Sequence, residues 1–109
     1  MGKNNFKTDQ FRRARGGYSR FLRIFCAKCK NFLALYQKDG PGPLKRMYID
    51  RFFSPDKLVA FQNVPLKKIP LFCCEKCTQV LGVPFLYYKE QRQAFRLFVG
   101  AVSKKIIKQ

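Results

Sequence analysis

The chain has 109 residues and a formal net charge of +17, because 23 Lys and Arg face only six Asp and Glu. This length suits one domain, and an apolar fraction of 47% with twelve Phe is not a composition that forces disorder throughout the chain. A small domain with such a charge repels itself, which predicts a polyanionic partner such as nucleic acid or an anionic membrane surface. No apolar run approaches the roughly 20 residues that span a bilayer.

Residues 1–20 are a basic segment that ends in Arg15-Gly-Gly-Tyr-Ser-Arg20. The two glycines interrupt regular structure, and Arg and Tyr side chains bind phosphates and unpaired bases. We therefore expect an extended arm that binds RNA, with a solubilising tail as the alternative. Residues 1–15 lack the apolar stretch of a secretory signal, although an Arg-rich organellar transit peptide is a second interpretation of them.

Short strands are predicted after the arm. Phe21–Phe25 and Phe32–Tyr36 flank the first cysteine pair, as the two strands of a hairpin. Asp39-Gly40, followed by two prolines, predicts a tight loop, and Leu44–Ile49 is the strand expected to return from it.

The segment from Asp50 to Pro70 contains three prolines and has no clean periodicity. We expect a short helical turn that starts at Ser54, with Pro55 at its first helical position, and then an extended crossover. A second hairpin is predicted from Phe85–Tyr88 and Ala94–Val99. Its tip contains Lys89, Glu90 and Arg92, which we expect to be solvated.

The cysteines give the most specific signal. Cys26-Ala-Lys-Cys29 and Cys74-Glu-Lys-Cys77 are two CxxC pairs, and two such pairs on separate turns hold one tetrahedral Zn²⁺. Since the chain has no His, all four ligands are predicted to be thiolates, which favours one structural zinc ion. Cys73 is expected to point elsewhere, as a small buried apolar side chain. Five free cysteines or an iron–sulfur cluster are the alternatives.

With its two CxxC pairs, each placed on a hairpin, the chain resembles the zinc ribbons of ribosomal proteins and transcription factors from about Leu22 to Val99. Two runs, Leu35–Arg51 and Gln91–Ala101, are also similar to small, poorly characterised prokaryotic zinc-ribbon proteins. The resemblance implies the metal and the fold, and the added basic arm is typical of ribosomal proteins. In this chain Lys30-Asn31 follows the first pair, where a knuckle commonly has Gly.

These observations predict a mainly β fold, a zinc ribbon of two knuckle-bearing hairpins around one Zn²⁺. Its parts are the basic arm (1–20), the zinc-ribbon domain (21–102) and a basic tail (103–109). The residues expected to bind RNA share a cationic or stacking side chain outside the predicted core; they are Arg12, Arg13, Arg15, Tyr18, Arg20, Arg23, Lys38, Lys45, Arg46, Arg51, Lys67, Lys68, Lys104 and Lys105. Phe6 and Phe11 either stack on bases or pack on the protein core.

The function predicted from these features is that of a structural RNA-binding protein, ribosomal or ribosome-associated, which contacts rRNA and neighbouring ribosomal proteins in the cytoplasm or an organelle. A DNA-bound zinc ribbon of transcription and a protein-binding adaptor are the alternatives. An enzyme is not expected, since the chain has no His, only three Ser and no paired carboxylates in sequence. For the same reasons we expect no small-molecule substrate. A membrane partner is not expected either, since no apolar run is long enough to span a bilayer.

Overall fold

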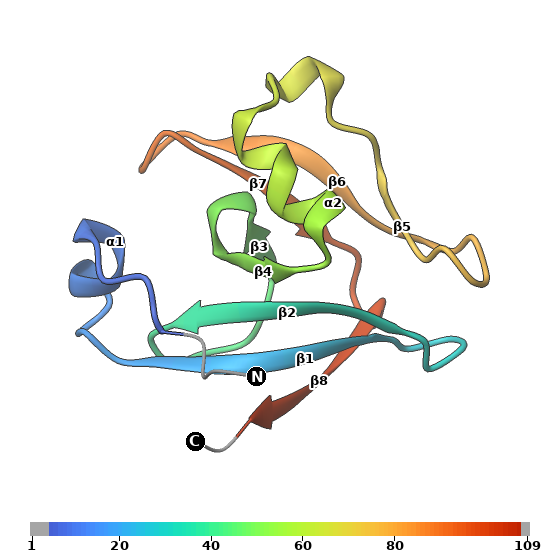
Figure 1. Cartoon of the computed structure of the whole chain (residues 1–109), viewed down its shortest axis with the longest axis horizontal. Coiled ribbons are helices and arrows are strands. Elements are labelled where there is room, and N and C mark those ends of the chain that lie inside the picture. The colour runs from blue at the N-terminus through green and yellow to red at the C-terminus, as the bar shows by residue number, and fades with distance from the viewer. Residues whose placement is uncertain (1–4, 108–109) are drawn as a thin grey trace.

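The computed structural model describes residues 5–107 and contains two four-stranded antiparallel sheets, one above the other (Figure 1). The first sheet has the order β4-β2-β1-β8; its strands are β1 (Ser19–Cys26), β2 (Phe32–Asp39), β4 (Phe52–Ser54) and β8 (Val102–Ile107). The second has the order β3-β7-β6-β5; its strands are β3 (Arg46–Tyr48), β5 (Phe72–Cys73), β6 (Val80–Tyr87) and β7 (Arg92–Leu97). The mainly β fold is confirmed.

Helical structure is confined to short elements. The two α-helices are α1 (Gln10–Ala14) and α2 (Asp56–Val59), and three 3-10 turns are η1 (Ile49–Arg51), η2 (Ala60–Asn63) and η3 (Leu66–Lys68). The predicted helical turn near Pro55 is confirmed as α2, although Pro55 is its cap residue rather than its first helical residue. No helix within residues 5–107 is long and apolar enough to cross a membrane.

The core lies between the two sheets, because strand alternation sends one set of side chains inward. Leu22 and Ile24 of β1 meet Met47 and Phe95 of the second sheet in one buried cluster. The ring of Phe95 stacks on that of Phe72 with 5.1 Å between centroids. Burial of these large side chains is the main stabilising contribution to the fold.

The loop after Asp39 does not form the predicted hairpin. β3 pairs with β7 in the second sheet, where Met47 faces Phe95, whereas β2 pairs with β4 through Tyr36 and Phe52. Gly40 and Gly42 have φ values of 73° and 105°, so the Gly-Pro-Gly-Pro loop carries the chain from one sheet to the other. The crossover buries Met47 between the sheets, which a simple return along β2 would not do. The second predicted hairpin, β6–β7, is confirmed.

The expectation of an extended N-terminal arm is corrected. Asp9 caps α1 by accepting hydrogen bonds from the N–H groups of Phe11 and Arg12. The buried carboxamide of Gln37 accepts from the backbone N–H of Lys7 and donates to its carbonyl. The ring of Phe6 stacks on Phe21 at 4.5 Å, so Phe6 packs on the protein core. Residues 5–18 are therefore part of the domain; residues 1–4 lie outside the described range.

The basic tail is likewise not a separate part. Residues 102–107 form β8, which pairs with β1 from Phe21↔Ile107 to Cys26↔Val102. The apolar Val102 packs against the core cluster, which favours the strand over a free tail. Only residues 108 and 109 of the predicted tail lie outside the described range.

Candidate metal centre and the buried ion pairs

The two CxxC pairs lie on two turns with the same backbone geometry, at the same end of the molecule (Figure 1). In the first turn the N–H of Lys30 donates to the carbonyl of Cys26 at 2.8 Å; in the second, the N–H of Thr78 donates to Cys74 at 2.9 Å. The residues after each pair, Lys30 and Thr78, have φ values of 67° and 64°. This left-handed conformation explains why knuckles commonly have Gly at this place.

The four predicted cysteines form one cluster. All four Sγ atoms lie within 4.8 Å of one another, and two of the separations are 3.7 Å (Cys26 to Cys77) and 3.5 Å (Cys29 to Cys74). A tetrahedral ion with metal–sulfur bonds of about 2.3 Å requires sulfur–sulfur distances of about 3.8 Å. The cluster therefore fits one metal ion held by four thiolates, of which two come from each hairpin.

The local electrostatics of the cluster favour a bound cation. Backbone N–H groups of Cys29 and Lys28 lower the pKa of Cys26. Burial opposes the ionisation of Cys74, but N–H groups of the second knuckle and neighbouring sulfur atoms lower its pKa to about 6. The N–H of Asn31 favours the thiolate of Cys29, yet burial and the other three sulfurs raise its pKa to about 11. Four thiolates this close require a positive charge among them.

Cys73 lies outside the sulfur cluster, as predicted, but it is exposed rather than buried. It lines an apolar cavity of about 270 Å³ together with Phe32, Phe61 and Leu71. The preference for Cys74 over Cys73 as a cluster member is thus supported, and the expected burial of Cys73 is wrong.

The opposite end of the molecule contains a continuous chain of ion pairs. Its members alternate in sign and come from five places in the sequence. In contact order they are Asp9, Arg51, Asp50, Arg92, Glu90 and Arg15, with Asp39 as a second partner of Arg51. We call this set the ion-pair chain. It fixes both ends of α1, since Asp9 is the N-cap and Arg15 the C-cap of that helix.

Arg51 is the buried centre of the ion-pair chain. Its side chain is 1% exposed, and it donates to both oxygens of Asp9 at 2.6 and 3.0 Å and to Asp39 at 2.8 Å. The hydrogen bonds from Arg51 hold the pKa of Asp9 far below its usual range. Arg51 is therefore inaccessible to phosphate groups, and the prediction that it binds RNA is wrong.

The predicted solvated hairpin tip is also corrected. Arg92 is buried, makes a two-point ion pair with Asp50 at 2.6 and 3.1 Å, and lies 3.7 Å from the ring centroid of Tyr48. Burial opposes the ionisation of Glu90, but hydrogen bonds from Arg15 and Arg92 lower its pKa. Only Lys89 of the three tip residues is exposed.

The other predicted RNA-binding residues fall into two groups. Most are exposed: Arg13, Tyr18, Arg20, Arg23, Lys45, Lys67, Lys68, Lys104 and Lys105. Arg12, Arg15, Lys38 and Arg46 are half-buried. The structure brings together Arg20 with Lys38 and Arg23 with Lys105 as cross-strand partners, and Arg15, Lys38, Lys45 and Arg46 line one cavity of about 350 Å³. Lys67 and Lys68 lie apart from these, in η3.

Sequence reasoning missed the ion-pair chain because its partners are far apart along the chain. Asp9 and Arg51 are separated by 42 positions, and Arg15 and Glu90 by 75. No spacing rule connects such residues. The only available signal was the small number of carboxylates in the sequence, four of which belong to the ion-pair chain.

Comparisons of the chain with protein-family models, with curated proteins and with solved structures found no match. The sulfur cluster and the two-sheet fold therefore define the class: a small, basic, mainly β protein with four clustered cysteines placed to hold a metal ion.

Proposed function

We propose that this chain is a structural RNA-binding zinc-ribbon protein, ribosomal or ribosome-associated, which contacts rRNA. The metal in this proposal is one Zn²⁺, since an all-sulfur tetrahedral set suits zinc and leaves no open position for a substrate. Its role is to join two hairpins and stabilise the fold. RNA is then bound by side chains on the protein surface.

The distribution of carboxylates is the observation that carries the proposal. Four of the six bind Arg15, Arg51 and Arg92 in the ion-pair chain, which leaves the rest of the chain with 20 Lys and Arg and two carboxylates. One of these two, Glu75, pairs with the exposed Lys57. The positive charge of the surface is thus almost uncompensated, and a polyanion is the partner that neutralises it.

The spread of this charge supports RNA rather than duplex DNA. Exposed Lys and Arg occur on α1, β1, η3 and β8, so they face several directions. A protein that reads the major groove concentrates its contacts on one helix or ribbon, whereas the longest helix within residues 5–107 has five residues. A protein embedded among RNA helices is contacted from several sides.

Sedimentation with ribosomal particles tests the proposal. We expect the zinc-loaded protein to sediment with ribosomal subunits at about 50 mM salt and to dissociate progressively towards about 200 mM, because each phosphate contact releases a counterion. As a specificity control, excess duplex DNA is added and should not displace it. Migration with RNA polymerase would support the DNA-bound alternative, and binding to neither particle would support the adaptor; each result contradicts the proposal.

A further inference from the structure

Two arginines outside the ion-pair chain lie next to each other without a carboxylate partner. Arg46 of β3 and Arg96 of β7 are directly opposite in the strand register. Among residues 5–107, no carboxylate lies within ion-pair distance of either. Like charges in this position destabilise a sheet. The arrangement therefore differs from Arg15, Arg51 and Arg92, all of which are paired.

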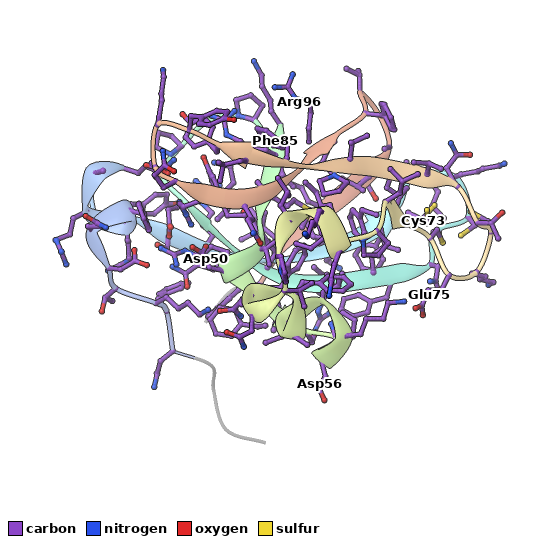
Figure 2. The ribbon with its side chains drawn as sticks, turned by 90° about the horizontal axis from the view of Figure 1, so that it is seen from above. Asp50, Asp56, Cys73, Glu75, Phe85 and Arg96 are labelled. Atoms are coloured by element: carbon purple, nitrogen blue, oxygen red, sulfur yellow. The ribbon has the colours of Figure 1, made fainter. Side chains whose placement is uncertain are left out.

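Arg46 and Arg96 lie on the outer face of the second sheet. Their neighbours Met47 and Phe95 are fully buried in the core, so alternation places the two arginines on the opposite face. Figure 2 shows Arg96 beside Phe85, on the side of the molecule away from Asp56. The unpaired arginines thus face outward.

Each of these arginines rests on an aromatic ring. The guanidinium carbon of Arg46 is 4.2 Å from the ring centroid of Tyr87, and that of Arg96 is 5.0 Å from the ring of Phe85. Such contacts hold the guanidinium planes over the sheet and order both side chains without neutralising them. The cations are thereby positioned before any ligand arrives.

A hollow of about 570 Å³ adjoins the two arginines. Lys45, Arg46 and Arg96 line it together with the rings of Phe85 and the half-exposed Phe98, and its lining contains no carboxylate. A site with three cations and two aromatic rings matches a phosphate joined to a flat base. Bases inside a duplex are already stacked and do not reach such rings, whereas unpaired bases do.

We propose that this hollow binds an unpaired nucleotide of the RNA, with the phosphate between Arg46 and Arg96 and the base against Phe85 or Phe98. This inference rests on the proposed function, and it adds that the RNA segment recognised here is single-stranded. Of the residues that line the hollow, Lys45 and Arg46 are predicted from the sequence to bind RNA, whereas Arg96, Phe85 and Phe98 are not.

The test is the affinity of the zinc-loaded full chain for a labelled single-stranded RNA of about 12 nucleotides, measured by fluorescence anisotropy. The same sequence as a duplex is the reference ligand. We expect Arg96→Gln to weaken single-strand binding about tenfold and to reduce the slope of log affinity against log salt by about 0.7, the share of one phosphate contact. Phe85→Leu is expected to weaken it about tenfold with an unchanged salt slope, since stacking involves no counterion.

Two matched control variants lie elsewhere on the surface. Lys67→Gln removes an exposed positive charge from η3, and Phe32→Leu truncates a half-exposed ring on β2. Both should reduce single-strand affinity less than threefold, and none of the four variants should lose its zinc or its circular dichroism spectrum. The wild-type protein should also bind the single-stranded RNA more tightly than the duplex.

Three outcomes would overturn the inference. If the wild type binds RNA but Arg96→Gln and Phe85→Leu behave like their controls, the hollow is not the site and the proposed function stands. If the duplex binds as tightly as the single strand, an unpaired base is not what is recognised. If the wild type binds neither RNA but binds vesicles of phosphatidylglycerol, the proposed function fails together with the inference.

Discussion

The two ends of the sandwich are held together by opposite kinds of chemistry. At one end, four sulfur atoms from two hairpins gather where only a cation makes their ionised forms compatible. At the other, three guanidinium groups and four carboxylates neutralise one another without any added ion. The first end requires a bound cation and the second requires buried ion pairs, so a substitution can weaken one without the other.

The largest effect is expected at the metal end. Cys77→Ser removes one of four ligands, and metal binding of this type contributes about 10–16 kcal/mol to the folding of small zinc domains. We expect the variant to lose its metal and its folded circular dichroism spectrum at 25 °C. A folded, metal-free Cys77→Ser protein would show that the ion-pair chain and the core stabilise the fold without a metal.

Cys73→Ser is the matched control for this experiment, because Cys73 is the one cysteine outside the cluster. It should retain one metal ion per chain by elemental analysis, with an unchanged melting temperature. Loss of metal from Cys73→Ser would mean that the ligand set has been assigned incorrectly.

At the other end, Arg51→Met should destabilise the protein by about 3–5 kcal/mol, measured by urea unfolding, because Asp9 and Asp39 lose their buried partner. Arg23→Met, an exposed arginine on β1, is the control and should change the unfolding free energy by less than about 0.5 kcal/mol. Adding Asp9→Asn and Asp39→Asn to Arg51→Met should restore part of the lost unfolding free energy, because the unpaired carboxylates are removed. An Arg51→Met protein as stable as its control would contradict a stabilising role for the ion-pair chain.

Acid should weaken the ion-pair end through its carboxylates. The folded protein lowers the pKa of both Asp9 and Glu90, so the stability they contribute is complete above their unfolded values of 3.8 and 4.5 and is lost as pH falls below these values. Glu90→Gln should therefore show a smaller loss of unfolding free energy below about pH 4.5. Protonation of the thiolates affects the wild type and the variant equally, so the difference between their unfolding free energies reports on the Glu90 carboxylate. Identical pH profiles of the two proteins would contradict a stabilising role for that carboxylate.

The smallest effect concerns the second knuckle. Thr78 is a β-branched residue at a φ of 64°, a conformation that costs L-residues about 1–2 kcal/mol. Thr78→Gly should raise the unfolding free energy by about 0.5–1 kcal/mol, the remainder being lost to the entropy of glycine in the unfolded chain. Lys76→Gly, in the same turn but without a positive φ, should lower it instead.

The metal end was predictable from the sequence because its signal is local. A CxxC spacing constrains two sulfur atoms on one turn, so Cys26, Cys29, Cys74 and Cys77 were identified without knowledge of the fold. The hairpin β1–β2 and most of the hairpin β6–β7 follow from short apolar runs bounded by turn residues, which are also a local signal. The start of β6 does not, since Gly82 and Pro84 predict a turn where the strand continues.

The ion-pair end was not predictable because each of its contacts depends on the fold. Arg51 resembles any surface arginine in the sequence, and only the crossover of the chain after Asp39 brings it to Asp9. The same crossover was predicted as a hairpin, since a Gly-Pro-rich turn does not specify which strand the returning segment joins. The arm was predicted to be extended for a related reason: its partners, Gln37 and Glu90, are distant in sequence.

The position of β8 has a consequence for solubility. It is the outermost strand of its sheet, so one row of its backbone N–H and C=O groups has no neighbouring strand among residues 5–107. Another polypeptide can pair with such an exposed edge strand and so begin to aggregate. Lys104 and Lys105 lie in the middle of this strand, and a second copy adding there in antiparallel orientation would bring its own lysines against them. Repulsion between the lysines of two molecules therefore disfavours pairing of one β8 strand with another.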